Sequence, residues 1–157
     1  MTDTGIDFQK IQYRTSAVTE ILSLRHRVLR PGLAIESAEF DGDMDASTLH
    51  FAALWNDRAL SCLSVYASQW KDDDALQLRG MATDASHQRC GIGRNLLQYA
   101  VSHVPPVKYI WCNARVEAIG FYQRLGWAVE SDEFDIEGVG PHVHMCCFLN
   151  ESAGVKK

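Results

Sequence analysis

Residues 80–94 carry the side-chain types and spacing best suited to chemistry. The segment runs from an apolar, strand-like stretch through a polar turn into an amphipathic helix, with Gly91 and Gly93 at the turn. The first turn of a helix exposes unpaired N–H groups and the positive end of the helix dipole, and both favour a phosphate. Arg89 and Arg94 add positive charge at the same place. The spacing alone leaves two interpretations open, a phosphate-binding turn and a tight strand-to-helix turn without a ligand.

Other ligand-binding patterns do not fit this chain. A P-loop requires a Gly-Lys pair, which the sequence lacks, and a dinucleotide fingerprint requires a third glycine where Leu96 stands. His142 and His144 precede the adjacent pair Cys146 and Cys147, without the separated ligand pairs of known zinc sites. The sequence therefore predicts no metal site.

The elements that must position the glycine turn follow from hydrophobic periodicity. Strands are expected at residues 8–14, 50–55, 59–68, 75–83, 109–113, 127–134 and 142–149. Helices are expected after the candidate N-caps Thr15 and Ser16, from about Gly91 to Pro105, and over residues 116–125. The order β-α-β-β-β-α-β-α-β-β predicts an α/β domain with a mixed central sheet and flanking helices.

Length and composition exclude several classes of protein. With 157 residues, 46% of them hydrophobic, the chain suffices for a single domain over residues 1–157. The net charge of −5 argues against general nucleic-acid binding, which depends on clustered Lys and Arg. No apolar run reaches the roughly 18 residues of a membrane span, and we expect no secretory signal. The 5 cysteines, odd in number and without a CxxC pair, favour a reducing cytoplasm.

Residues 88–93, Gln-Arg-Cys-Gly-Ile-Gly, carry a motif that is known from one family of enzymes. They match the Q/R-x-x-G-x-G/A motif of the GNAT superfamily of N-acyltransferases, and residues 81–83 resemble the end of its fourth strand. Residues 113–115, Asn-Ala-Arg, and 120–127, Gly-Phe-Tyr-Gln-Arg-Leu-Gly-Trp, are similar to its second signature. Residues 140–145 resemble, more loosely, an ElaA-like branch. The resemblance covers nearly the whole chain, although the family often has Pro, Gly and a basic residue where Ala85, Arg89 and Cys90 stand.

The resemblance implies acetyl-CoA as the cosubstrate. Its pyrophosphate would lie on the backbone N–H groups of residues 89–94, and its pantetheine arm would run as a pseudo-strand beside residues 81–83. A backbone N–H near Ala82 would polarise the thioester carbonyl. Asn113 is expected either on the pantetheine arm or as a helix cap. The implied cofactor-binding residues are Met81, Ala82, Thr83, Gln88, Arg89, Cys90, Gly91, Ile92, Gly93, Arg94, Asn113 and Tyr122.

The resemblance also implies catalytic roles. Tyr122 is the expected general acid for the leaving thiolate, and a core aromatic is the alternative interpretation of the same residue. Apart from the resemblance, His142 is the expected general base, because imidazole is the side chain that ordinarily titrates near neutral pH and the residue lies on the last predicted strand. His144 points to the same face of that strand by alternation. Glu36 or Glu39 of the acidic segment 33–48 is the other candidate base.

Three arginines fall on the first predicted helix. Arg25, Arg27 and Arg30 are expected on or near its polar side, where a solvated surface is the usual role. By the resemblance, this helix borders the acceptor site, and an arginine there would bind a substrate carboxylate.

The expected function is transfer of the acetyl group of acetyl-CoA to a primary amine of a small molecule or peptide, by direct attack of the amine. A non-catalytic acyl-CoA-binding module is the alternative, whereas a plain interaction domain leaves residues 88–93 unexplained. Acetyl-CoA and an amine acceptor are the expected partners, with no nucleic acid and no membrane. The last predicted strand, from residue 143 to 149, is expected to be able to pair across a homodimer.

Overall fold

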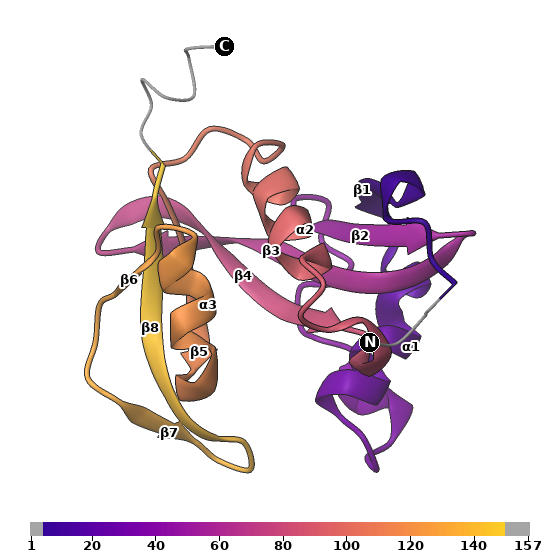
Figure 1. Ribbon diagram of the computed structural model, residues 1–157. Helices are drawn as coiled ribbons and strands as arrows, with labels where there is room; N and C mark the ends of the chain where they lie inside the picture. The colour runs from indigo at the N-terminus through magenta and orange to yellow at the C-terminus, as the bar shows by residue number, and fades with distance from the viewer. Residues whose placement is uncertain (1–4, 150–157) are drawn as a thin grey trace. The chain divides into compact units, whose positions relative to one another are not determined.

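The computed structural model describes residues 5–149 of the chain (Figure 1). The helices are α1 Val18–Leu29, α2 Ile92–Val101 and α3 Ile119–Arg124. The strands are β1 Gln12–Ser16, β2 Leu49–Trp55, β3 Arg58–Trp70, β4 Asp73–Thr83, β5 Tyr109–Arg115, β6 Ala128–Val129, β7 Phe134–Ile136 and β8 Gly140–Phe148. Single 3₁₀ turns occupy Phe8–Lys10, Ile35–Ala38, Ala85–His87 and Val116–Ala118. Among these described elements, no helix is long and apolar enough to cross a membrane.

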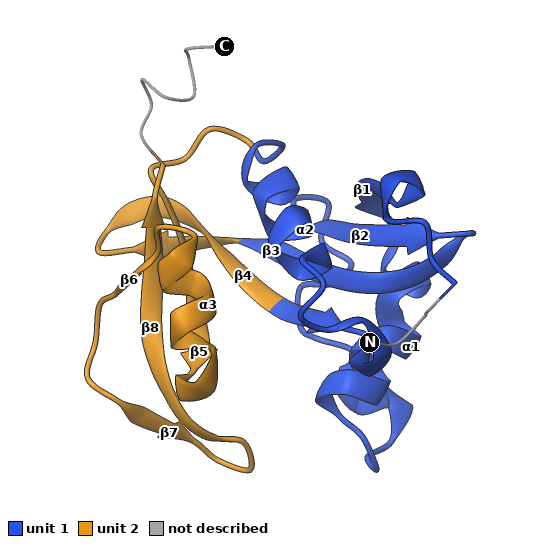
Figure 2. Cartoon of the chain, in the orientation of Figure 1, with its two compact units in different colours: residues 1–66, 80–104 blue, residues 67–79, 105–157 orange. Residues whose placement is uncertain are grey.

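The strands form one mixed sheet, which confirms the predicted α/β class. Its order is β1-β2-β3-β4-β5-β8-β6, with β7 beside β8. β4 and β5 pair in parallel, whereas β1 with β2, β2 with β3, and β5 with β8 pair antiparallel. The chain divides into two compact units (Figure 2). The first comprises Met1–Tyr66 and Gly80–Val104, and the second comprises Ala67–Arg79 and Pro105–Lys157.

In the first unit, β2 is buried on both of its faces. Ala52 and Leu54 pack against α1, whereas the ring of Phe51 meets that of Tyr99 on α2, with centroids 6.1 Å apart. Because alternate residues of a strand point to opposite faces, a strand covered on both sides needs an uninterrupted apolar run. This explains why the stretch from Phe51 to Leu54 shows no polar alternation.

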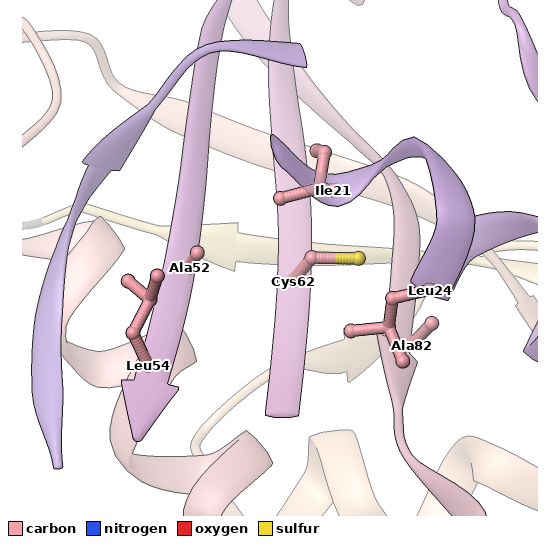
Figure 3. Packing of buried hydrophobic residues seen from close by; sticks show 6 residues of the cluster. All are labelled: Ile21, Leu24, Ala52, Leu54, Cys62 and Ala82. Carbon is pink, nitrogen blue, oxygen red and sulfur yellow. The ribbon is translucent and has the colours of Figure 1, made fainter. Parts of the chain in front are cut away.

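The core beneath α1 also holds the end of β4 (Figure 3). Ile21 and Leu24 of α1 lie over the sheet at a depth where both side chains are almost fully buried. Burial of one such side chain contributes roughly 1.5–3 kcal/mol. The strand residues of this cluster are Ala52, Leu54, Cys62 and Ala82. Ala82 therefore fixes β4 to the core directly before the chain enters the glycine turn.

In the second unit, β8 lies between β5 and the short strands β6 and β7. The register of β5 and β8 places Asn113 opposite His144 and Arg115 opposite His142, so these polar residues share one face. The alternate residues, Cys112 among them, are buried on the other face. β8 has strand partners on both of its edges. The predicted homodimer through residues 143–149 stays a prediction.

Some predicted boundaries are wrong for identifiable reasons. The strand predicted at residues 8–14 begins with a 3₁₀ turn, because the carboxylate of Asp7 caps that turn. Ser16 does not cap the first helix, because it pairs with His50 in the β1–β2 ladder, and α1 follows Ala17. The strand predicted at residues 127–134 splits into β6 and the start of β7, because Asp132 and the polar residues around it interrupt the pairing.

Candidate active site

The turn between β4 and α2 ends in an uncapped helix start. Gly91 is the N-cap of α2 with φ 87° and ψ 0°, a left-handed conformation that favours glycine. Within the described residues, no side chain caps α2 at this position by a hydrogen bond. The N–H groups of the first turn therefore point out of the helix end without an intrahelical acceptor. Together with the helix dipole, they suit an anion such as a phosphate.

Two neighbours shape this helix start. A Cβ placed on Gly91 would lie 3.1 Å from Nη2 of Arg94, so this guanidinium lies beside the N-cap. A Cβ placed on Gly93 would lie 3.1 Å from Oγ1 of Thr83, so the first turn of α2 runs close along the end of β4. Arg89 and Arg94 are both exposed. The first unit thus brings together the predicted residues 81–83 and 88–94.

Hydrogen bonds within the turn hold it in one shape. Nε2 of Gln88 donates to the carbonyl oxygen of Thr83 at 3.1 Å, which closes the turn. The carboxylate of Asp84 accepts from the N–H of Ser86 at 3.2 Å and from Nη2 of Arg27 at 3.1 Å. Burial would raise the pKa of Asp84, but the bonds from Ser86 and Arg27 outweigh burial, and the pKa is lowered. The turn is therefore preorganised before any ligand binds.

The end of β4 is anchored to β3 by a buried serine. Oγ of Ser61 donates to the carbonyl oxygen of Ala82 at 3.2 Å and lies 2.9 Å from Oγ1 of Thr83. The N–H of Asp84 donates to the carbonyl oxygen of Leu60 at 2.8 Å. Because Ser61 is fully buried, water does not compete for its bonds. The backbone of residues 82–84 consequently has a fixed position on the sheet.

In the second unit, Tyr122 of α3 is buried, and its hydroxyl bonds to the thiol of Cys112 on β5. Its ring packs against Trp127 with centroids 5.2 Å apart. Burial raises the pKa of Tyr122 well above its ordinary value, so the hydroxyl keeps its proton at neutral pH. Burial also raises the pKa of Cys112 to about 12. Tyr122 is thus a core aromatic that carries a protonated hydroxyl.

The polar face of β5 and β8 carries Asn113 and the histidines of β8. Nδ1 of His144 lies 2.8 Å from Oδ1 of Asn113. Nδ1 of His142 lies 2.8 Å from the carbonyl oxygen of Gly140, and His142 is only 4% exposed. Asn113 does not cap a helix, because it lies inside β5 and Arg115 caps the following turn. Its side-chain oxygen is engaged by a histidine that the periodicity placed on the same face.

Arg25 does not lie on a solvated helix face, and that prediction is wrong. Its side chain is fully buried, with Nη1 donating to Oδ2 of Asp43 at 2.7 Å and to the carbonyl oxygen of Ala38 at 2.8 Å. Nη2 donates to Oγ of Ser64 at 2.9 Å. Arg27, in contrast, is exposed and paired with Asp84, as described above. A buried arginine bound in this way cannot serve as a carboxylate receptor for a substrate.

Asp43 of the acidic segment is the other half of this buried pair. Its carboxylate also accepts from the hydroxyl of Tyr66 at 2.5 Å and from the N–H of Phe40 at 2.8 Å. Burial alone would raise its pKa, but the hydrogen bonds from Arg25, Tyr66 and Phe40 together lower it. Nε2 of His50 lies 2.9 Å from the backbone oxygen of Asp43. The network ties the acidic segment to α1, β2 and β3.

The remaining predicted groups lie outside these clusters. Glu36 and Glu39 are exposed on the acidic segment of the first unit. A cavity of about 320 Å³ opens on the second unit and is lined by Arg115, Glu117, Ala118, Val139 and Pro141. Over residues 5–149, no group of His, Cys, Asp and Glu side chains has the arrangement of a metal site.

Comparisons with known proteins find acetyltransferases. Residues 30–149 match the family described as acetyltransferase (GNAT) domain. The chain is 30% identical over 147 residues to an uncharacterized N-acetyltransferase, YitI, from Bacillus subtilis, which covers 90% of this chain and 99% of that protein. The crystal structure of ElaA from Escherichia coli superimposes with a TM-score of 0.73 at 16% identity, over 87% of this chain and 99% of that one. An aminoglycoside 6′-N-acetyltransferase complexed with coenzyme A gives 0.66 at 13% identity, over 87% and 96%.

Proposed function

Because the chain belongs to the GNAT family of acyl-CoA-dependent N-acetyltransferases, we propose that it transfers the acetyl group of acetyl-CoA to a primary amine of a small molecule or peptide. The amine would attack the thioester directly, within a single catalytic domain that spans residues 1–157. The observation that carries the proposal is the start of α2, where Gly91 leaves the first-turn N–H groups uncapped beside the exposed Arg94.

The first unit would bind the cosubstrate chiefly through its backbone. The pyrophosphate would accept hydrogen bonds from the N–H groups of residues 89–94, and Arg89 and Arg94 would add charge. A side chain at Gly91 would occupy the space beside these groups, so the glycine fits a bound phosphate. The pantetheine arm would pair with residues 81–83, whose position Ser61 fixes, and the N–H near Ala82 would polarise the carbonyl.

Tyr122 and His142 are the groups proposed to move protons. Tyr122 would protonate the leaving thiolate, since a tyrosine hydroxyl carries its proton at neutral pH. An alkylamine is an ammonium ion at neutral pH and must lose a proton before it attacks. The sequence points to His142 for this step, and its Nδ1 is held by Gly140, which directs Nε2 away from that bond. Asn113 would contact the pantetheine arm or support the histidines of β8.

A non-catalytic acyl-CoA-binding module is the second candidate. The presence of Tyr122 favours catalysis, because it stands where the GNAT resemblance places the general acid. Acetyl-CoA and the amine are the proposed partners, without nucleic acid or membrane. A cytoplasmic setting is supported by the cysteines, all of which carry free thiols: Cys62, Cys90, Cys112, Cys146 and Cys147.

Calorimetric titration with acetyl-CoA tests the binding half of the proposal. Arg94→Ala is expected to weaken binding about 10- to 100-fold, because a charge-assisted hydrogen bond contributes roughly 1.5–3 kcal/mol. Arg58→Ala removes an exposed arginine at the β2–β3 turn and should leave the affinity unchanged. Equal losses in both variants, or no binding by the unaltered protein, would contradict the proposed site.

A thiol-release assay over a panel of primary amines tests the catalytic half. We expect at least one amine to accelerate release of coenzyme A well above the rate without an acceptor. If acetyl-CoA binds and no amine accelerates release, the chain is a binding module instead.

A further inference from the structure

The imidazole of His144 is held from one side by a group that can only accept a hydrogen bond. Oδ1 of Asn113 lies 2.8 Å from Nδ1 of His144, so Nδ1 carries the hydrogen and donates it. The neutral ring then has its lone pair on Nε2. Over residues 5–149, Nε2 has no hydrogen-bond partner. It is not one of the buried unpartnered polar atoms, so solvent reaches it.

The backbone of His144 is fixed as firmly as its side chain. Its N–H donates to Oγ of Ser131 at 2.8 Å, and its carbonyl oxygen accepts from the N–H of Glu130 at 2.8 Å. On the opposite edge it pairs with Asn113 of β5. The residue is therefore clamped between β5 and the segment after β6, which places the ring reproducibly.

Aromatic rings surround the imidazole and set its plane. The ring centroids of Phe134, Trp111 and Trp70 lie 4.6, 5.6 and 6.0 Å from that of His144. Nε1 of Trp111 donates to Oγ of Ser68 at 3.1 Å, so the ring of Trp111 is itself fixed in position. All three aromatic residues and His144 are half-buried, so the cluster remains open to solvent on one side. A fixed ring with a free lone pair at an open surface suits proton transfer.

The neighbouring histidine is placed differently. His142 is 4% exposed, stacks on Phe134 at a centroid distance of 6.2 Å and donates from Nδ1 to its own strand. A substrate amine reaches an open nitrogen more easily than a buried one. Two charged groups lie on neighbouring elements: Arg115 of β5 pairs with His142, and Glu130, whose N–H bonds to His144, forms an ion pair with Lys71 at 3.4 Å.

We propose that His144 is the general base of the acetyl transfer and that Asn113 is the residue that positions it. The proposal rests on the proposed function and assigns its base to a residue other than His142. The ammonium would first lose a proton to Nε2 of His144, which releases it to solvent. The free amine nitrogen would then bond to the thioester carbonyl carbon and give its second proton to Nε2. The carbon–sulfur bond would break, and the thiolate would take a proton from Tyr122. The proton on Nε2 then leaves to solvent, and Tyr122 regains one from solvent, so the products are the acetamide and coenzyme A.

The test compares histidine variants at saturating acetyl-CoA and amine. His144→Gln keeps a polar side chain and is expected to lower kcat by about 10²–10⁴-fold, the usual contribution of a positioned base. It should also abolish the acidic limb of the pH profile of kcat, while the dissociation constant of acetyl-CoA stays unchanged. The matched control is His103→Gln, because His103 is exposed and lies just after α2. This variant should keep both kcat and the acidic limb of its pH profile.

Two further variants separate chemistry from folding. In His144→Ala, imidazole added to the solution should restore part of the rate, which a purely structural role does not predict. Asn113→Leu cannot accept the hydrogen from Nδ1, so it should lower kcat and displace the acidic limb. Asn113→Asp keeps an acceptor oxygen and should restore much of the loss.

The outcomes distinguish this proposal from the one it rests on. If the unaltered protein acetylates no amine, the proposed function fails, and the assignment of a base fails with it. If the protein is active and His144→Gln keeps its rate and acidic limb, only the assignment to His144 fails. Loss of the limb in His142→Gln with His144→Gln unaffected would assign the base to His142 instead.

Discussion

Each of the two units contains a polar cluster beside its strands, and the two clusters differ in what they leave unused. In the first unit, Arg25 and Asp43 form an ion pair with side chains 0% and 7% exposed, and further bonds from their neighbours surround it. In the second unit, His144 is bound through Nδ1 to Asn113, and its Nε2 has no partner among residues 5–149. We call the first cluster closed, because the terminal nitrogens of Arg25 and the oxygens of Asp43 are all bonded. We call the second cluster open, because only one ring nitrogen of His144 is bonded.

The difference indicates which cluster suits the proposed chemistry. Both terminal nitrogens of Arg25 and both oxygens of Asp43 are already bonded, so the pair offers a ligand no free group on these atoms. Its role is to hold the acidic segment against α1 and β3, at the cost of removing two charges from water. His144 has an unused lone pair in a fixed ring at an open surface, which is what a base requires. Charge alone would favour the Arg25–Asp43 cluster, whereas an available lone pair favours His144.

Breaking the closed cluster should have the largest effect on stability. Arg25→Met leaves the carboxylate of Asp43 buried without its cation, and we expect the free energy of unfolding to fall by about 3–5 kcal/mol. The double variant Arg25→Met/Asp43→Leu should recover a large part of the loss, because neither charge then remains. Urea titration measures the free energy of unfolding of the unaltered protein, the single variant and the double variant. A loss of less than about 1 kcal/mol in Arg25→Met would place this pair with ordinary surface ion pairs.

In the second unit, Tyr122→Phe should lower kcat. Its free energy of unfolding should fall less than that of Arg25→Met. The proton donor is lost while the ring remains, so kcat is expected to fall about 10²-fold with unchanged affinity for acetyl-CoA. Tyr109→Phe, in β5 of the same unit, is the control and should be neutral. Unchanged turnover of Tyr122→Phe at saturating substrates would remove Tyr122 from the acid role.

Acid should weaken the closed cluster in a defined range. The pKa of Asp43 is lower in the folded state than its ordinary value of about 3.9. A group with a lowered folded-state pKa contributes stability above its unfolded pKa and loses it as the pH falls toward the folded one. The free energy of unfolding should therefore decline below about pH 4, and less steeply in Asp43→Asn. Urea titrations from neutral pH downward should show converging curves, and parallel curves would contradict this role.

The smallest effect is expected where a charged pair is exposed. The side chain of Arg27 is 47% exposed in its ion pair with Asp84, so Arg27→Ala should change the free energy of unfolding by less than about 1 kcal/mol. The same urea titration measures it. A loss comparable to that of Arg25→Met would mean that exposure does not distinguish the two arginines.

The fold was predictable because its strands and helices carry clear periodicity, but the placement of Arg25 was not. Arg25 lies four residues after the buried Ile21 and three before Val28, so helical spacing already places it on the apolar stripe. Its charge argued for the solvated side, and the partner that makes burial tolerable, Asp43, comes 18 residues later in a loop. Side-chain pairing across such a separation leaves no local pattern in a sequence.

The glycine turn was predictable because the residues that determine its shape lie next to one another in the sequence. A left-handed N-cap and a close approach to β4 both depend on glycines that stand in the sequence, at Gly91 and Gly93. The bond between Asn113 and His144 depends instead on the register of β5 against β8. Alternation places His142 and His144 on one face, but burial and tautomer, which distinguish them, depend on the neighbours that the fold brings to each ring.

The most direct test of the whole account measures both products of one reaction. The protein is incubated with acetyl-CoA and each amine of a panel, and free coenzyme A and acetylated amine are quantified together by mass spectrometry. We predict equal amounts of the two products with at least one amine, and a large reduction of both in His144→Gln. Release of coenzyme A without acetylated amine, or neither product with any amine while acetyl-CoA binds, would contradict direct N-acetyl transfer.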